Sequence, residues 1–76
     1  MLELYSMESC GYCKKVKDYF KTHNIEFIEH DVNDPENAIK LMKLGGKPQV
    51  PFLVDKDKNI YLYDSEHIIK YIQEKE

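Results

Sequence analysis

Apolar and polar residues along the chain alternate in some segments and recur with helical spacing in others. Strict alternation from Leu2 to Tyr5 is typical of a short strand. From Cys10 onward, apolar residues recur every three or four positions with lysines between them, which predicts a helix that ends near His23 and Asn24. The residues from Ile25 to Asp31 alternate again. The first third of the chain is therefore predicted to form a strand, a helix and a second strand.

A second helix is predicted to begin at Asp34-Pro35. Asp34 can accept a backbone N–H there, and Pro35 stands where the helix needs no donor. The helix is predicted to end at Gly45-Gly46, because glycine adopts the left-handed conformation that follows many helices. Its expected apolar stripe consists of Ala38, Leu41 and Met42.

The last third of the chain predicts a strand hairpin followed by a helix. Phe52-Leu53-Val54 is a continuous apolar run, as expected of a strand buried on both faces. Residues 55–59 form a polar hairpin loop, and Ile60 to Tyr63 returns as the partner strand. Asp64 or Ser65 caps a final helix with an apolar face toward the core, made of Ile68, Ile69 and Ile72.

These elements run in the order βαβαββα. The crossover helix requires the first two strands to be parallel, whereas the short loop between the last two requires them to be antiparallel. The expected fold class is α/β, with a four-stranded mixed sheet between helices on both faces, a three-layer α/β/α sandwich. No linker or repeat divides the chain, so residues 1–76 are predicted to form a single domain.

Charge and composition exclude several functions. The 76 residues carry a net charge of -3 and include no arginine, so neither a nucleic-acid-binding face nor a polybasic membrane anchor is expected. The first residues lack the charged and apolar regions of a secretory signal, and no segment approaches membrane-spanning length. We therefore expect a reducing, cytoplasmic location, where a Cys-x-x-Cys pair is redox-active or metal-binding more often than structural.

Cys10 and Cys13 are the only cysteines. A disulfide between them closes too small a loop to stabilise the fold much, which favours chemistry over cross-linking. Zinc requires about four ligands, and the three histidines show no ligand spacing, so no metal site is expected. The histidines are interpreted as surface or cap residues. These histidines are His23, His30 and His67. The structural alternative is that both cysteines pack as small apolar residues.

The position of the cysteines on the first helix assigns them different roles. Cys10 lies at or just before the first helical residue, where unpaired N–H groups and the helix dipole favour a thiolate, the attacking species in disulfide exchange. Cys13 lies one turn further on, along the apolar stripe. It is predicted to stay a thiol until Cys10 forms a mixed disulfide, and then to resolve that intermediate.

Three sequence features together resemble the glutaredoxin family of the thioredoxin fold. They are Cys10-Gly11-Tyr12-Cys13 at the first helix, Val50-Pro51 opening the third strand, and Asp64-Ser65 at the last helix. The stretch 45–54 is also similar to the corresponding region of glutathione transferase N-terminal domains, which share this fold. The resemblance covers essentially the whole chain.

The resemblance implies a thiol-disulfide oxidoreductase that uses glutathione as co-substrate and binds no cofactor tightly. Its partners would be disulfide-containing or glutathionylated proteins, and the protein would be a monomer. The Val50-Pro51 bond would be cis. Ordinary alternatives are a surface role for Tyr12 and Lys47 and a helix-capping role for Asp64 and Ser65. The implied glutathione-binding residues are Tyr12, Lys47, Gln49, Val50, Pro51, Asp64 and Ser65.

Departures from the family pattern leave other functions open. Gly11 replaces the proline that is commonest there, and Met7 and Glu8 stand where relatives carry a basic residue that would pair with the thiolate and with glutathione. One alternative is therefore a glutaredoxin-like protein reduced by thioredoxin reductase or another flavoprotein. A second is a non-catalytic module that binds an iron–sulfur cluster, glutathione or a partner protein, and a third is a detached transferase N-terminal domain.

Overall fold

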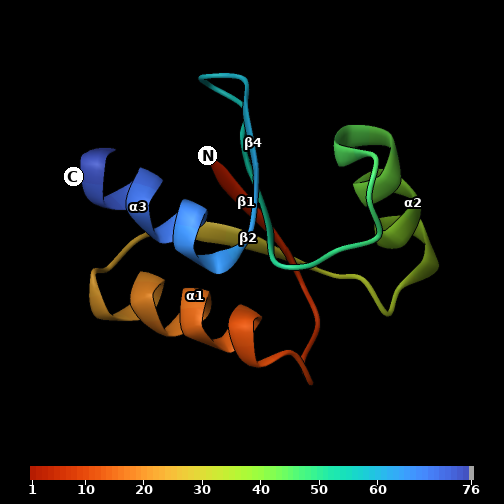
Figure 1. Cartoon of the computed structure of the whole chain (residues 1–76), viewed down its shortest axis with the longest axis horizontal. Helices are drawn as coiled ribbons and strands as arrows, with labels where there is room; N and C mark the ends of the chain where they lie inside the picture. The colour runs from red at the N-terminus through yellow and green to blue at the C-terminus, as the bar shows by residue number, and fades with distance from the viewer. Residues whose placement is uncertain (76) are drawn as a thin grey trace.

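The computed structural model describes residues 1–75, which form four strands and three helices in the predicted order βαβαββα (Figure 1). The elements are β1 (Leu2–Ser6), α1 (Gly11–Thr22), β2 (Phe27–Asp31), α2 (Pro35–Gly45), β3 (Phe52–Asp55), β4 (Ile60–Tyr63) and α3 (Ser65–Lys75). None of these helices combines the length and the apolar content needed to cross a lipid bilayer.

The sheet is mixed, as the connections require. Its strand order is β2-β1-β3-β4. β1 runs parallel to β2, with Leu2 opposite Phe27, and antiparallel to β3, with Leu4 opposite Leu53. β3 and β4 form the predicted antiparallel hairpin. The central strands β1 and β3 are buried throughout, whereas the edge strands are only partly covered.

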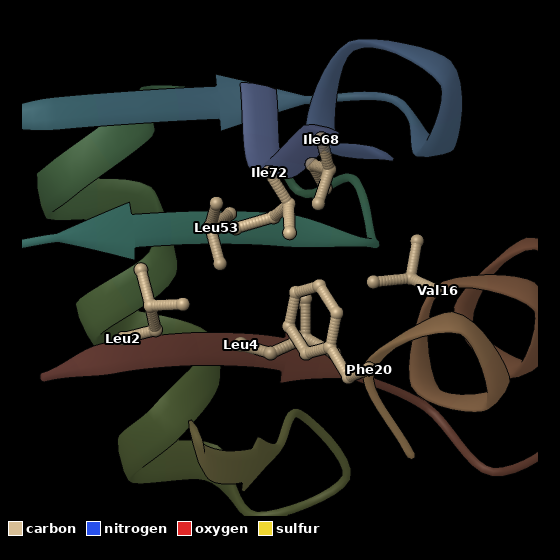
Figure 2. Close-up of a cluster of buried hydrophobic side chains, with 7 residues drawn as sticks. All are labelled: Leu2, Leu4, Val16, Phe20, Leu53, Ile68 and Ile72. Atoms are coloured by element: carbon tan, nitrogen blue, oxygen red, sulfur yellow. The ribbon is translucent and has the colours of Figure 1, made fainter. Parts of the chain in front are cut away.

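Helices cover both faces of the sheet, which confirms the predicted three-layer architecture. Helices α1 and α3 pack together on one face, and α2 lies on the other (Figure 1). Figure 2 shows the main core between the sheet and the α1–α3 layer. This core contains Leu2, Leu4, Val16, Phe20, Leu53, Ile68 and Ile72. The core on the α2 side is smaller and contains Tyr5, Leu41, Phe52 and Val54.

The ends of α2 form as the sequence predicts. The Asp34 side chain accepts a hydrogen bond from the backbone N–H of Glu36, and Pro35 occupies the first helical position. At the other end, Gly46 adopts a left-handed φ of 84° and its N–H bonds to the Met42 carbonyl. The predicted apolar stripe is only partly correct, because Leu41 is buried while Met42 is 44% exposed.

Two strand boundaries differ from the prediction. β2 begins at Phe27 rather than Ile25, because Asn24 turns the chain with a φ of 55° and the Ile25 N–H bonds back to the Phe20 carbonyl at 2.8 Å. Asp55 was predicted to lie in the hairpin loop, but it is the buried last residue of β3. Its carboxylate accepts hydrogen bonds from Tyr71 at 2.6 Å and Lys75 at 2.9 Å, and these partners allow the charge to be buried.

The prediction that all three histidines are surface or cap residues is wrong for one of them. His23 is exposed and caps the C-terminus of α1, and His67 is exposed. His30 is instead a half-buried residue of β2, whose Nε2 is 2.7 Å from the Glu3 carboxylate and whose ring packs on Tyr5. Parallel pairing of β1 with β2 brings these side chains together, a contact that their separation in sequence conceals.

Candidate active site

Cys10 occupies the N-cap position of α1. Its backbone is extended, with φ −91° and ψ 117°, and its N–H bonds to the Met7 carbonyl at 3.1 Å. The backbone N–H of Cys13 donates to the Cys10 Sγ at 3.2 Å. In the usual N-cap arrangement a side-chain oxygen accepts this bond. Here a sulfur takes that place, so the free donors of the helix terminus point at a partly exposed thiol.

Cys13 lies one turn inside the helix and is fully buried. Burial, together with a hydrogen bond to the Cys10 side chain, raises the pKa of the Cys13 thiol to about 12. Both cysteines are free thiols in the structure. The pair therefore combines an accessible sulfur at the helix terminus with a protonated sulfur behind it, which is the asymmetry that stepwise disulfide exchange requires.

A pocket of about 370 Å³ opens next to the cysteine motif. It is lined by Tyr12, Gln49, Val50, Pro51, Asp64, Ser65, Glu66 and His67. Tyr12 comes from the turn between the cysteines and is 69% exposed. The Val50-Pro51 peptide bond, which comes just before β3, is cis as expected. Three segments far apart in sequence thus meet at one cavity.

The polar side of this pocket is organised around Asp64. This residue joins β4 to α3 with a positive φ of 72°. The Gln49 Nε2 donates to one Asp64 oxygen at 3.1 Å, and the His67 Nδ1 lies 3.6 Å from the other. Ser65 begins α3 and is buried beside it. A carboxylate and the start of a helix therefore stand together at the end of the pocket.

Of the residues that the resemblance implied for glutathione, only Lys47 does not line the pocket. Its backbone is held by the Tyr63 hydroxyl, which accepts from the Lys47 N–H at 3.0 Å and donates to the Lys47 carbonyl at 2.9 Å. The Lys47 ammonium lies over the Tyr63 ring, 5.7 Å from its centroid. This cation–π contact directs the side chain to Tyr63.

Glu66 and His67 also line the pocket, although neither was expected from the sequence to have a binding role. The available signal was their position in the first turn of α3, next to Asp64 and Ser65. Helical geometry places the residue three positions after Asp64 on the same side of the turn. Asp64 was implied by the family resemblance, whereas this helical spacing is the signal that points to His67.

Comparison with known proteins identifies the family. The glutaredoxin family model matches residues 2–60. The chain belongs to the glutaredoxin family. A glutaredoxin-like 8.6 kDa protein of the rubredoxin operon of Clostridium pasteurianum is 35% identical to this family member over 54 residues, which cover 66% of this chain and 72% of that protein.

Solved structures confirm the fold of this glutaredoxin family member. The thioredoxin-like protein BC3987 superposes with a TM-score of 0.83 at 23% identity, covering 97% of each chain. Glutaredoxin 2 of Salmonella typhimurium in complex with glutathione gives a TM-score of 0.80 at 27% identity over 95% of this chain and 32% of its own. Human glutathione-S-transferase T1-1 superposes with a TM-score of 0.83 at 24% identity, over 99% of this chain and 32% of its own. The thioredoxin-like fold and the similarity to a part of glutathione transferases are thus both confirmed.

Proposed function

We propose that this protein is a glutathione-dependent thiol-disulfide oxidoreductase in which Cys10 attacks and Cys13 resolves. The observation that carries the proposal is the N-cap position of Cys10, whose Sγ accepts the Cys13 backbone N–H at 3.2 Å beside a pocket of about 370 Å³. Membership of the glutaredoxin family supports the same chemistry. Its partners would be disulfide-containing or glutathionylated proteins in the cytoplasm.

The reaction proceeds by two successive thiol-disulfide exchanges. The Cys10 thiolate attacks one sulfur of the substrate disulfide, the S–S bond breaks, and the departing thiolate takes a proton from solvent. Cys13 then loses its proton and attacks the Cys10 sulfur, which expels the second substrate thiol and leaves a Cys10–Cys13 disulfide. Two glutathione molecules restore the dithiol, and they leave as oxidised glutathione.

The pocket offers complementary groups for glutathione. Asp64 can bind the α-amino group of the γ-glutamyl residue, while Ser65 and the free N–H groups of α3 can bind its carboxylate. The main chain of Val50 can pair with the cysteinyl backbone, as an extended peptide pairs with a strand edge. Tyr12 forms the wall nearest the cysteines. Lys47 does not line the pocket and its ammonium lies over the Tyr63 ring, so its role in glutathione binding stays a prediction.

One observation favours a different reductant. The pocket contains two carboxylates, Asp64 and Glu66, and its lining includes neither lysine nor arginine. Glutathione carries two carboxylates of its own, and like charges that meet without a cation oppose binding. A second candidate is therefore a glutaredoxin-like protein that performs the same exchange but is reduced by thioredoxin reductase or another flavoprotein.

Reduction of a glutathione mixed disulfide tests the proposal. With glutathione and glutathione reductase supplying electrons, we expect turnover by the wild type, loss with Cys10→Ser and partial retention with Cys13→Ser. A wild type that fails with glutathione but turns over with thioredoxin reductase would establish the second candidate. If Cys13→Ser abolished turnover while Cys10→Ser retained it, the assigned roles would be reversed.

A further inference from the structure

A charged network joins α1 to β1 and β2, and none of its residues lines the pocket beside the cysteine motif. The Lys17 Nζ contacts the Glu29 Oε2 at 3.0 Å, and the Ser6 hydroxyl donates to the same oxygen at 2.6 Å. Ser6 is fully buried at the end of β1, and the Lys17 side chain is 18% exposed. The Glu29 Oε2 thus contacts Ser6 of β1 and Lys17 of α1, and it fixes the position of the Lys17 ammonium.

Helical spacing places Lys17 on the same face of α1 as the resolving cysteine. Lys17 follows Cys13 by four residues on α1, so the two side chains share one face of the helix. The Lys17 charge and a hydrogen bond from the Met7 backbone both lower the pKa of the Cys13 thiol, against the larger opposing effects of burial and of Cys10. The hydrogen bond to Glu29 raises the pKa of Lys17 and so keeps it a cation.

Among the main groups that shift the pKa of Cys13 within residues 1–75, Lys17 is the cation. Cys10 faces it from the N-cap, and α3 contributes the apolar Ile68 and Ile72 to the adjoining core. Lys17 lines a cavity of about 340 Å³ together with three carboxylates. They are Glu8 from the loop before α1, and Glu29 and Asp31 from β2.

We propose that Lys17, positioned by Glu29 and Ser6, stabilises the Cys13 thiolate during the resolving step. This inference rests on the proposed function and adds a positioning residue to it. In the dithiol, the Cys13 proton is hydrogen-bonded to Cys10. When Cys10 enters a mixed disulfide it loses its negative charge, so this hydrogen bond and the repulsion between two sulfur anions both weaken.

Lys17 then remains as the cation that acts on Cys13. The Cys13 thiol releases its proton to water, and its sulfur electron pair forms the bond to Cys10. The bond between Cys10 and the substrate sulfur breaks, and the leaving thiolate takes a proton from solvent. Attack by Cys13 is thus promoted after Cys10 has reacted, which keeps the two steps in order.

The two steps can be separated with 5,5′-dithiobis(2-nitrobenzoate). Attack by Cys10 releases a first coloured thiolate at a rate proportional to reagent concentration. Attack by Cys13 then releases a second thiolate at a rate that does not depend on reagent concentration. We expect Lys17→Met and Lys17→Gln to slow the second phase about tenfold at pH 7 and to move its pH midpoint upward, since an opposite charge changes a pKa by about one unit or more.

Three controls make the result specific. The first phase should stay unchanged, Lys17→Arg should restore the second phase, and Lys21→Met should leave both unchanged because it removes the same charge one turn further from Cys13. A normal first phase with an unaltered second phase in Lys17→Met and Lys17→Gln would overturn the role of Lys17 alone. A wild type without a first phase would overturn the proposed function itself.

Discussion

The backbone N–H of Cys13 donates a hydrogen bond to the Sγ of Cys10, 3.2 Å away. This contact joins the two cysteines within the first turn of α1, but their exposure to solvent differs. Cys10 keeps partial access to solvent, while Cys13 is enclosed by the core beneath the helix. The difference in accessibility predicts a difference in reactivity.

Alkylation should therefore select Cys10. With the pKa of Cys13 raised to about 12 by burial and by Cys10, its thiolate fraction at pH 7 is on the order of 10⁻⁵. We expect iodoacetamide to modify Cys10 at least ~100-fold faster than Cys13, measured by mass spectrometry of the reduced protein. In urea, where the burial is removed, both cysteines should react. Equal rates in the folded protein would contradict the placement of Cys13.

Replacement of Asp64 should weaken substrate binding rather than chemistry. In Asp64→Asn the pocket loses the charge proposed for the α-amino group, and the residue lies away from the reacting sulfurs. We expect the KM for a glutathione mixed disulfide to rise about tenfold with kcat nearly unchanged. Glu74→Gln, at the exposed far end of α3, is the matched control. An unchanged KM in Asp64→Asn would remove this residue from the glutathione site.

Asp55 should contribute to the acid sensitivity of folding. Hydrogen bonds from Tyr71 and then Lys75 lower the pKa of this buried carboxyl below its unfolded value. The resulting stabilisation is present above the unfolded pKa of about 3.9 and is lost as pH falls through the lower folded pKa.

The corresponding test is urea unfolding at a series of pH values. Between pH 7 and pH 2, the free energy of unfolding should decline by about 1–2 kcal/mol less in Asp55→Asn than in the wild type. Glu74→Gln, which alters an exposed carboxylate near the end of α3, should follow the wild type. Parallel pH profiles for wild type and Asp55→Asn would show that this carboxyl does not contribute.

Gly45 is required by close packing at the end of α2. A Cβ at this position would collide with the Tyr63 hydroxyl and lie 3.0 Å from the Phe52 ring. Tyr63 holds the Lys47 backbone, so its displacement would also loosen the segment that leads to Val50. We expect Gly45→Ala to destabilise the protein by about 1–3 kcal/mol in thermal unfolding.

Gly11→Ala is the control for this substitution, because a Cβ there meets nothing within 4 Å. Its melting temperature should stay within a few degrees of the wild-type value. If Gly45→Ala and Gly11→Ala had the same melting temperature, the close packing of Gly45 against Tyr63 would not contribute to stability.

Much of the architecture follows from local sequence. The position of Cys10 at the start of α1, the Asp34-Pro35 start of α2 and the Ile60–Tyr63 strand were all predicted correctly, because each depends on neighbours within one turn or one hairpin. Alternation predicted that β2 begins at Ile25. This prediction was wrong because a left-handed turn at Asn24 separates Ile25 from the strand.

Sequence by itself determined the order of elements, the sheet class and the cysteine pair on its helix, since these depend on periodicity and on residues close along the chain. Tertiary structure alone decided that Gln49 meets Asp64, that Lys47 turns to Tyr63, and that Ser6 and Lys17 share Glu29. Those contacts join segments at least a dozen residues apart. They depend on strand order, register and side-chain packing, which local spacing does not encode.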